Sequence, residues 1–434
     1  MGGILIKGAT IITVENHDDI IPGGEIAIEG QYIVSVGPAG SAPAGFVPDR
    51  VLDAPDMLAM PGFVNSHTHA AMTLLRSYAD DLPLMKWLEE KIWPLEAKLE
   101  EEDIYWGTML CCLEMIRSGT TAFADMYFHM NEVARAVERS GIRADLSRGM
   151  IGVGPEAQSA LDFSREFVSQ WHGRGNGRIT VRLGPHAPYT CPPDYLKKVI
   201  SLSGELNVGI HIHLAETKTE IEDMAKRYGM SPIRLMDSVG LFELPVLAAH
   251  CVHLDDGDIE ILAQKKVGVA HNPESNMKLA SGVAPVTRML EAGVTVGLGT
   301  DGAASNNNLD MLEEMRSAAL LQKVSTMNPL ALPSFQALRM ATAGGAGALG
   351  MAGQTGVLRK GLKADIILMD TRKPHFFPRH DWIANVVYAA QSSDVHTVII
   401  DGNIVMEGRK VLTIDEDEVY EQVEARAKRL TGIK

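Results

Sequence analysis

The sequence contains little cysteine. Only four of its 434 residues are cysteines, and they are scattered along the chain: Cys111, Cys112, Cys191 and Cys251. Four thiols are too few for a disulfide framework, and the absence of a Cys-x-x-Cys pair argues against a zinc ribbon or a thioredoxin-like motif. Because such a chain suits a reducing compartment, we expect a cytoplasmic protein.

Positive charge and long apolar runs are lacking as well. The chain has 40 basic and 55 acidic residues, a formal net charge of −15. Nucleic-acid binding needs a basic face, so we expect no nucleic-acid partner. The first residues show no basic segment followed by an apolar stretch and a cleavage site, which argues against a signal peptide. No apolar run reaches membrane-spanning length, so we expect no membrane partner.

The two ends of the chain resemble each other in composition. Both carry segments rich in β-branched residues, namely residues 3–14, 25–37, 364–369 and 395–407. We expect a polar turn at Pro22-Gly23-Gly24, and the pair Asp401-Gly402 is a strong hairpin signal. Neither end can bury both of its faces alone. We therefore expect residues 1–58 and 355–434 to form one small composite β-sandwich domain.

The middle of the chain alternates between short apolar runs and helical patterns. The runs include residues 120–126, 179–185, 208–216, 246–250, 267–273 and 294–300. Residues 103–119 show helical periodicity and end at a glycine. About eight such repeats over residues 59–354 predict an α/β protein with a (β/α)₈ barrel. In that fold the chemistry lies at the C-terminal ends of the strands.

Histidines and one aspartate gather at these strand ends. His67 and His69 close the run that begins at residue 60, and alternate residues of a strand point to the same side. At or just past other strand ends lie His186, His213, His250, His271 and Asp301. A His-x-His pair alone is a weak signal of metal binding, but the other histidines and the aspartate at neighbouring strand ends strengthen it. We predict one divalent ion per chain, Zn²⁺ first and Fe²⁺ as the alternative, held by His67, His69, His213 and Asp301.

Such a ligand set leaves one coordination position for water, which marks a catalytic site. The ion lowers the pKa of that water toward neutrality. Glu216, three residues after His213, is placed to carry protons. The alternative for Glu216 is an ordinary acidic residue at a helix N-terminus. His211, two residues deeper than His213 on the same face, is expected to support the site from the interior.

Four stretches together resemble the amidohydrolase superfamily. They are PGFVNSHTH at 61–69, HLAE at 213–216, the histidine that closes the sixth strand (His250), and LGTDGAASNN at 298–307. The flanking β segments are similar to the split sandwich domain of that superfamily, so the resemblance covers nearly the whole chain. Two-metal members carry a carbamylated lysine at the end of strand four, where this chain has Gly184-Pro185-His186. The resemblance therefore points to the mononuclear branch, which is rich in deaminases of purine and pyrimidine rings.

Within that branch the chain looks most like the methylthioadenosine/S-adenosylhomocysteine deaminase family. The motifs are KIWPLEAKL at 91–99, GPHAPYTC at 184–191, HLAETKTE at 213–220 and HNPESNMKLASG at 271–282. The resemblance implies that Glu96 holds the ribose hydroxyls and that His186 contacts the purine nucleoside. It also implies an arginine after the third strand that meets the substrate's tail. Arg148 fits this role best, with Arg143 and Arg135 as alternatives.

The implied reaction is hydrolytic deamination at C6 of an adenine nucleoside, which yields the hypoxanthine nucleoside and ammonia. Asp301 takes a proton from the attacking water, Glu216 protonates N1 of the ring, and His250 acts near the attacking oxygen. Asp301 and Glu216 therefore also contact the substrate. One alternative is a deaminase or chlorohydrolase of the same branch acting on guanine, a pterin, cytosine or an s-triazine. Another is a catalytically inactive relative. The preferred nucleoside and the oligomeric state, a dimer or tetramer by family habit, stay open.

Overall fold

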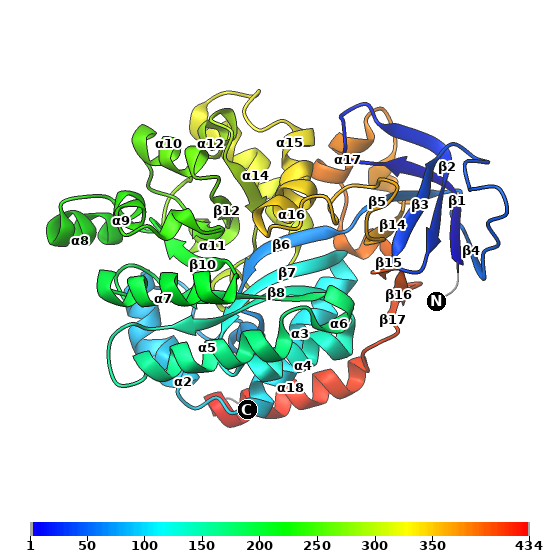
Figure 1. Cartoon of the computed structure of the whole chain (residues 1–434). Helices are drawn as coiled ribbons and strands as arrows, with labels where there is room; N and C mark the ends of the chain where they lie inside the picture. The colour runs from blue at the N-terminus through cyan, green and yellow to red at the C-terminus, as the bar shows by residue number, and fades with distance from the viewer. Residues whose placement is uncertain (1–2, 433–434) are drawn as a thin grey trace.

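Two sheets organise the computed structural model, which describes residues 3–432 (Figure 1). One sheet has eight parallel strands in chain order: β6 (Phe63–Thr68), β7 (Thr120–Tyr127), β8 (Arg143–Met150), β9 (Ile179–Pro185), β10 (Ile210–Leu214), β11 (Val246–His250), β12 (Gly268–His271) and β13 (Thr295–Leu298). The barrel closes between its first and last strands, where the Asp301 amide donates to the His67 carbonyl at 2.9 Å. The expected (β/α)₈ barrel is confirmed.

Helices form the outer layer of the barrel. After β6 come α1 (Leu84–Trp87), a π-helical turn (Leu88–Ile92), α2 (Trp93–Glu96) and α3 (Glu101–Ser118). The others around the barrel are α4 (Met130–Ser140), α5 (Ala157–Trp171), α6 (Arg174–Gly177), α7 (Pro193–Leu206), α8 (Lys218–Tyr228), α9 (Pro232–Ser238), α10 (Asp256–Gln264), α11 (Pro273–Lys278), α12 (Val286–Glu291), α13 (Ala303–Asn306), α14 (Met311–Thr326), α15 (Ser334–Arg339) and α16 (Gly345–Ala348). None of the helices within residues 3–432 is long and apolar enough to cross a membrane.

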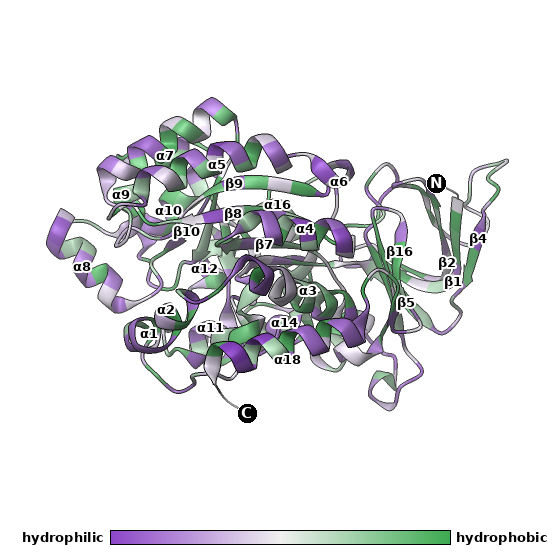
Figure 2. Cartoon of the chain, turned by 90° about the horizontal axis from the view of Figure 1, so that it is seen from below, coloured by the Kyte–Doolittle hydropathy of each residue, from purple (hydrophilic) through white to green (hydrophobic). Residues whose placement is uncertain are grey.

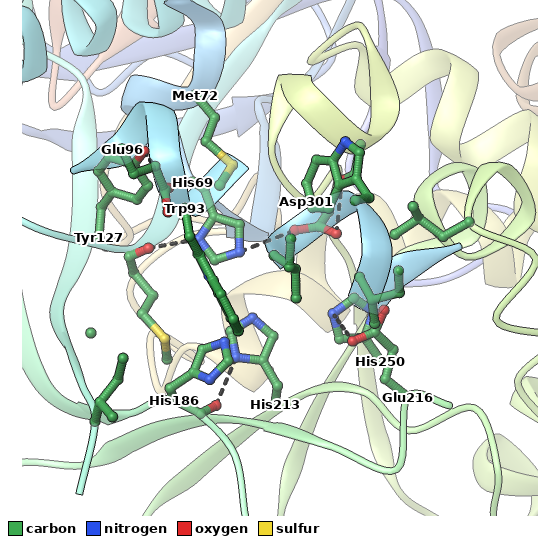
Figure 3. A pocket seen from close by; sticks show the side chains of 18 of the residues that line it. His69, Met72, Trp93, Glu96, Tyr127, His186, His213, Glu216, His250 and Asp301 are labelled. Atoms are coloured by element: carbon green, nitrogen blue, oxygen red, sulfur yellow. Dashed lines mark hydrogen bonds and ion pairs between the residues drawn. The ribbon is translucent and has the colours of Figure 1, made fainter. Parts of the chain in front are cut away.

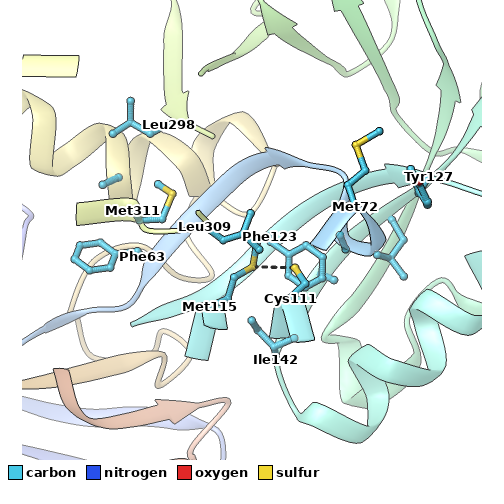
Figure 4. Close-up of a cluster of buried hydrophobic side chains, with 14 of the residues drawn as sticks. Phe63, Met72, Cys111, Met115, Phe123, Tyr127, Ile142, Leu298, Leu309 and Met311 are labelled. Atoms are coloured by element: carbon cyan, nitrogen blue, oxygen red, sulfur yellow. Dashed lines mark hydrogen bonds between the residues drawn. The ribbon is translucent and has the colours of Figure 1, made fainter. Parts of the chain in front are cut away.

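Amphipathic patterns explain how these helices cover the barrel. In α4 the buried side chains include Met130, Val133, Ala134 and Val137, a spacing that places them on one face of a helix. Figure 2 shows polar and apolar stripes alternating along the outer helices. Cys111, on α3, belongs to one apolar cluster with Phe63 of β6 and Phe123 of β7 (Figure 4). All four cysteines are free and buried in the structure.

Both ends of the chain build the second sheet, which mixes parallel and antiparallel pairs. Its order is β17 (Lys410–Val411), β16 (Asn403–Glu407), β15 (Val395–Ile400), β14 (Ile366–Asp370), β5 (Met57–Pro61), β1 (Gly3–Ile12), β2 (Ile20–Glu29) and β3 (Tyr32–Gly37), with β4 (Arg50–Asp53) paired to β1. The two ends meet where Ile366 of β14 pairs with Pro61 of β5. Residues from both ends, including Ile6, Ile28 and Ile399, share one apolar cluster. The extra domain from both chain ends is thus present.

One helix of the C-terminal segment leaves this sheet. Helix α18 (Glu416–Thr431) runs back along α3, where Arg429 pairs with the buried Asp103. The remaining helix, α17 (Trp382–Tyr388), lies between β14 and β15 in the chain. Strand β5 also continues to Pro61, past the expected boundary at residue 58. The division into 1–58 with 355–434 and 59–354 therefore remains a proposal.

The two expected turns have different outcomes. The prediction of a turn at residues 22–24 is wrong, because β2 runs without interruption from Ile20 to Glu29. Gly23 has a φ of 59°, and the register with β1 shifts between Ala9 and Ile11, so the glycines make an irregularity within the strand. Asp401 and Gly402, with φ of 52° and 75°, form the tight turn between β15 and β16. These positive φ values are those a two-residue hairpin requires.

A buried ion cluster fastens the barrel to the second sheet. Arg143, at the start of β8, donates from Nε to Asp365 at 3.0 Å and from Nη2 to Asp401 at 3.3 Å. Lys363 lies 3.2 Å from Asp401, so two cations face two carboxylates. The Arg143 side chain is 3% exposed. Removing one partner would leave a buried charge unpaired, which costs about 3–5 kcal/mol.

Candidate metal centre and active site

The C-terminal ends of the barrel strands open into one cavity of about 820 Å³ (Figure 3). Its polar lining includes His69, Glu96, His186, His213, Glu216, His250, Asp301 and Ser305. Its apolar walls include Met72, Leu84, Trp87, Leu88, Trp93, Met126, Phe128, Ile151 and Leu279. Most of the predicted site residues thus line one cavity, whose wall is part polar and part apolar, whereas His67 and Arg148 are absent from its lining.

The four predicted metal ligands converge at the floor of this cavity. The Nε2 atoms of His67 and His69 lie 3.4 and 3.2 Å from Asp301 Oδ1. Ligand atoms of His67, His69 and His213 lie within 4.8 Å of one another. Ligand atoms of His67, His250 and Asp301 also lie within 4.8 Å of one another. His250, which was predicted to act near the metal but not to bind it, therefore lies within the same cluster.

Hydrogen bonds behind the histidines show which ring nitrogens face the centre. The Nδ1 atoms of His69 and His213 donate to the carbonyls of Met126 and His186, at 2.6 and 2.8 Å. Because a carbonyl only accepts, each Nδ1 carries the hydrogen and each Nε2 keeps a lone pair. The Nε2 atom of His67 is buried without a hydrogen-bond partner. Converging lone pairs and a carboxylate are the donor set of a divalent metal, so these residues fit one.

His67 is oriented by a chain of side chains. The Ser147 hydroxyl donates to the Asp125 carbonyl at 2.8 Å and lies 3.2 Å from His211 Nδ1. His211 Nδ1 therefore donates to Ser147, which leaves His211 Nε2 to accept from His67 Nδ1 at 2.9 Å. Burial lowers the pKa of His67 to about 4 and that of His211 well below its usual value. Both rings are neutral, as a ligand and its support must be.

Asp301 is held in place by its own neighbours. Its Oδ2 accepts from the hydroxyls of Ser275 and Ser305, at 2.7 and 3.1 Å. Its backbone has a φ of 59°, a left-handed conformation that non-glycine residues rarely adopt. Burial opposes its charge, yet the neighbouring rings of His67 and His69 hold the pKa of Asp301 well below its usual range in the metal-free chain. An ionised carboxylate beside imidazole lone pairs suits a cation.

Glu216 and His250 form a second pair at the edge of the metal cluster. Glu216 Oε2 lies 3.8 Å from His250 Nε2, and its Oε1 accepts from the Ser281 hydroxyl at 3.4 Å. The side chain of Glu216 is almost fully buried. Burial raises the pKa of Glu216, which helps it to hold a proton at neutral pH. A carboxyl group that can keep a proton near the site is suited to general acid catalysis.

Glu96 and His186 lie at other sides of the cavity. The Tyr127 hydroxyl donates to Glu96 Oε1 at 2.6 Å, and burial raises the pKa of Glu96. In Figure 3 Glu96 and Glu216 lie at opposite ends of the pocket, with His69 and His213 between them. Burial lowers the pKa of His186 to about 4, so its ring is neutral. The cavity is therefore long enough to separate two carboxyl groups with different partners.

Among the three candidate arginines, the structure places Arg148 beside the cavity. Arg148 lies within β8, not after it, and lines an adjoining hollow that shares Phe128, Gly149 and Ile151 with the main cavity. Its guanidinium lies 5.6 Å from the centre of the Phe128 ring. Arg143 is buried in the ion cluster that joins the two sheets. Arg135 lies on the surface of α4 and pairs with Glu132.

Comparisons with known proteins agree with this geometry. Residues 58–405 match the sequence profile of the Amidohydrolase family. The chain belongs to this family. A 5-methylthioadenosine/S-adenosylhomocysteine deaminase of Pelotomaculum thermopropionicum is 67% identical over 432 residues, 100% of both chains. A zinc-bound adenosine deaminase from Xanthomonas campestris superposes with a TM-score of 0.95 at 34% identity, over 99% of each chain. An atrazine chlorohydrolase of Arthrobacter aurescens, complexed with zinc, gives a TM-score of 0.89 at 26% identity over 99% of this chain and 100% of its own.

This amidohydrolase is therefore a hydrolase acting on C–N bonds, and its strand ends carry a divalent-metal site. Sequence reasoning missed many of its pocket residues, Tyr127 and Trp87 among them. Tyr127 ends β7, so the rule that led to the other strand-end residues could have found it. Trp87 reaches the pocket from the helical segment after β6, and its position has no comparable signal. The amidohydrolase thus places its chemistry at the strand ends and part of its apolar wall on an inserted segment.

Proposed function

We propose that this chain deaminates adenine nucleosides at C6, with 5′-methylthioadenosine and S-adenosylhomocysteine as first substrates and adenosine as a further one. The products are the hypoxanthine nucleoside and ammonia. The observation that supports this best is a single cavity with a metal-ligand cluster at one end and the Glu96–Tyr127 pair at the other. The cytoplasm as location and a homo-oligomer as assembly stay predictions from the sequence.

The metal proposed for His67, His69, His213 and Asp301 is zinc, although the same donor set suits Fe²⁺. When bound, such an ion supplies a water of lowered pKa and polarises the reacting centre. The protein supplies the rest. Burial lowers the pKa values of His67, His211 and His213, so these rings add no charge to the site. The carboxylate of Asp301 is fixed by two serine hydroxyls.

Proton transfers fall to Asp301, Glu216 and His250. Asp301 accepts a proton from the attacking water, since its low pKa keeps it ionised at rest. Glu216, whose pKa burial raises, gives a proton to N1 of the ring, which lets C6 become tetrahedral. His250, 3.8 Å from Glu216, stabilises the attacking oxygen and helps to pass a proton to the leaving ammonia. The two carboxyl groups thus have opposite protonation states at the start of the reaction.

Substrate selection falls to the far end of the cavity. One oxygen of Glu96 already accepts from Tyr127, so the other is directed to the two ribose hydroxyls. His186 contacts the nucleoside, and Arg148 meets the carboxylate of an S-adenosylhomocysteine tail. A guanine, cytosine or triazine ring has no diol for Glu96 to hold. That difference separates the proposed activity from the other deaminases and chlorohydrolases.

Ammonia release from the three nucleosides, guanine and cytosine tests this proposal. Glu216→Gln should lower turnover by about 10²-fold or more, because the amide cannot give a proton. Its metal content should stay normal. Glu222→Gln, an exposed change on the following helix, is the matched control and should leave turnover unchanged. Equal turnover in Glu216→Gln would show that Glu216 is only a helix N-terminal residue.

Glu96→Ala tests the substrate class separately. Charge-assisted hydrogen bonds contribute about 1.5–3 kcal/mol each, so kcat/KM for the nucleoside should fall by about 10-fold or more. Adenine as free base should be an equally poor substrate of both enzymes. A uniform loss on all substrates, or better activity on guanine or cytosine, would contradict the nucleoside assignment and leave the metal and proton roles in place.

A further inference from the structure

Glu220 lies at the start of α8, directly behind the proposed proton donor. The sequence Thr217-x-x-Glu220 is typical of a capping box, in which the glutamate accepts from the N–H of the threonine. The first half of the motif is present, since the Thr217 hydroxyl accepts from the Glu220 amide at 3.2 Å. The glutamate, however, reaches further back. Its two oxygens accept from the amides of Ala215 and Glu216, both at 2.9 Å.

The turn that Glu220 holds is strained. Ala215 has a φ of 53°, in the left-handed region that non-glycine residues rarely adopt. Such a conformation persists only where its surroundings enforce it. Glu220 is 4% exposed, so its carboxylate has no competition from bulk water for these two N–H groups. Its two oxygens match the two consecutive amides one to one.

The same turn is tied to the end of the neighbouring strand. The Ala215 carbonyl accepts from the amides of Val252 and His253, at 3.0 and 2.9 Å. His250 and Cys251, just before them, have φ of 72° and 49°. Two left-handed turns from adjacent strands therefore lie side by side, and one presents Glu216 while the other presents His250. Their facing atoms are 3.8 Å apart.

We propose that Glu220 is the positioning residue of the proton-transfer pair: by binding both amides of the 215–216 turn, it fixes the direction of the Glu216 side chain toward the pocket. Glu220 is absent from the lining of the cavity, so it acts through Glu216 and does not touch substrate. This inference rests on the proton-transfer role proposed for Glu216. It holds for whichever ring the enzyme deaminates, because the contacts are made by the protein alone.

A double-mutant cycle on the metal-loaded enzyme tests the inference. Glu220→Gln keeps the size of the side chain but offers one acceptor oxygen and turns an NH₂ group toward an amide donor. Kinetics are measured at pH 8, because burial raises the pKa of Glu220 to about 7. We expect kcat to fall by about 10-fold or more, with KM changed less than about threefold and metal content unchanged. In a Glu216→Gln background the same substitution should cause no further fall in kcat.

Asp258→Asn is the matched control. Asp258 is also a buried N3 carboxylate, at the start of α10, and it accepts from the Asp255 amide in its own capping box. Its loss should lower thermal stability and leave kcat unchanged. If Glu220→Gln does not fold, Glu220→Asp, which keeps the charge but cannot reach both amides, replaces it with the same expected fall in kcat.

The outcomes separate this inference from the proposed function. An unchanged kcat in the Glu220 variant, or an equal fall in both backgrounds, would overturn the positioning role while leaving Glu216 as the proton donor. An unchanged kcat in Glu216→Gln alone would instead overturn the proton-donor role, and the positioning role with it.

Discussion

His211 should control metal affinity although it does not point at the metal site. In the structure its Nε2 accepts the hydrogen of His67 Nδ1 at 2.9 Å, which leaves the lone pair of His67 on Nε2. His211→Leu removes that acceptor. The ring of His67 then prefers to carry its hydrogen on Nε2, which faces Asp301 3.4 Å away and is the atom proposed to bind the ion. Metal binding must force the hydrogen back to Nδ1, where it is buried without an acceptor.

The magnitude follows from that unpaired donor. Leaving a buried N–H without a partner costs about 1–3 kcal/mol, and about 1.4 kcal/mol is a tenfold change in affinity. We expect zinc to bind His211→Leu about 10- to 100-fold more weakly, the usual scale for residues that support metal ligands. Competition with a chelator of known affinity measures the change. His211→Gln offers an amide oxygen to His67 and should recover most of the affinity.

Thr190→Val provides the control for this prediction. Thr190 lies 3.0 Å from the Nδ1 atom of His186, a neighbouring histidine that is not a proposed ligand. Its loss should leave zinc affinity unchanged. Wild-type zinc affinity in His211→Leu, with thermal stability preserved, would refute the tautomer argument.

Three further predictions follow from the site. His213→Ala should lose most of its metal, and chelated wild-type enzyme should lose activity and regain it with Zn²⁺ or Fe²⁺; two ions per site by metal analysis would contradict the single-ion assignment. Arg148→Ala should lower kcat/KM for S-adenosylhomocysteine by about 10-fold and spare methylthioadenosine, which has no carboxylate; equal losses would argue against the tail contact. Burial raises the pKa of Asp125 from 3.8 to about 7, so the metal-free folded chain holds a proton that the unfolded chain has released. Its free energy of unfolding should therefore fall as pH rises from about 4 to 7, and Asp125→Asn should reduce that slope by up to about 1.4 kcal/mol per pH unit in chemical denaturation.

Much of the site could be predicted from the sequence because the barrel obeys a simple rule. Strand ends meet at one face, so residues that close apolar runs can be expected to lie together. His67, His213 and Asp301 were found in this way, far apart in the chain but adjacent in space. The hairpin at Asp401 was predictable for a local reason, since its turn needs positive φ at two consecutive positions.

The remaining features depend on contacts that no local pattern reveals. Arg143 and Arg148 lie on the same strand, and the sequence offered Arg143 as an alternative to Arg148. The two arginines differ because the guanidinium of Arg143 pairs with Asp365, which lies 222 positions later in the chain. The support of His67 depends likewise on Ser147 and His211, which are 64 positions apart. Glu220 belongs to a recognisable capping motif, in which its carboxylate would accept from the amide of Thr217. The sequence does not show that the carboxylate accepts from the amides of Ala215 and Glu216 instead.

The second sheet sets the order in which the chain can fold. Arg50 near the N-terminus pairs with Glu407, which is 357 positions later in the chain. Arg143 pairs with Asp365, which is 222 positions later. During synthesis the N-terminal strands and the entire barrel emerge before β14 does, so β5 keeps an open edge and Arg143 an unpaired charge. Closing so long a loop is slow, and an open strand edge invites pairing with other chains. The last seventy or so residues therefore cover the open edge of β5 only after the barrel strands have been synthesised. We expect the nascent chain to be most prone to aggregation just before these residues are made.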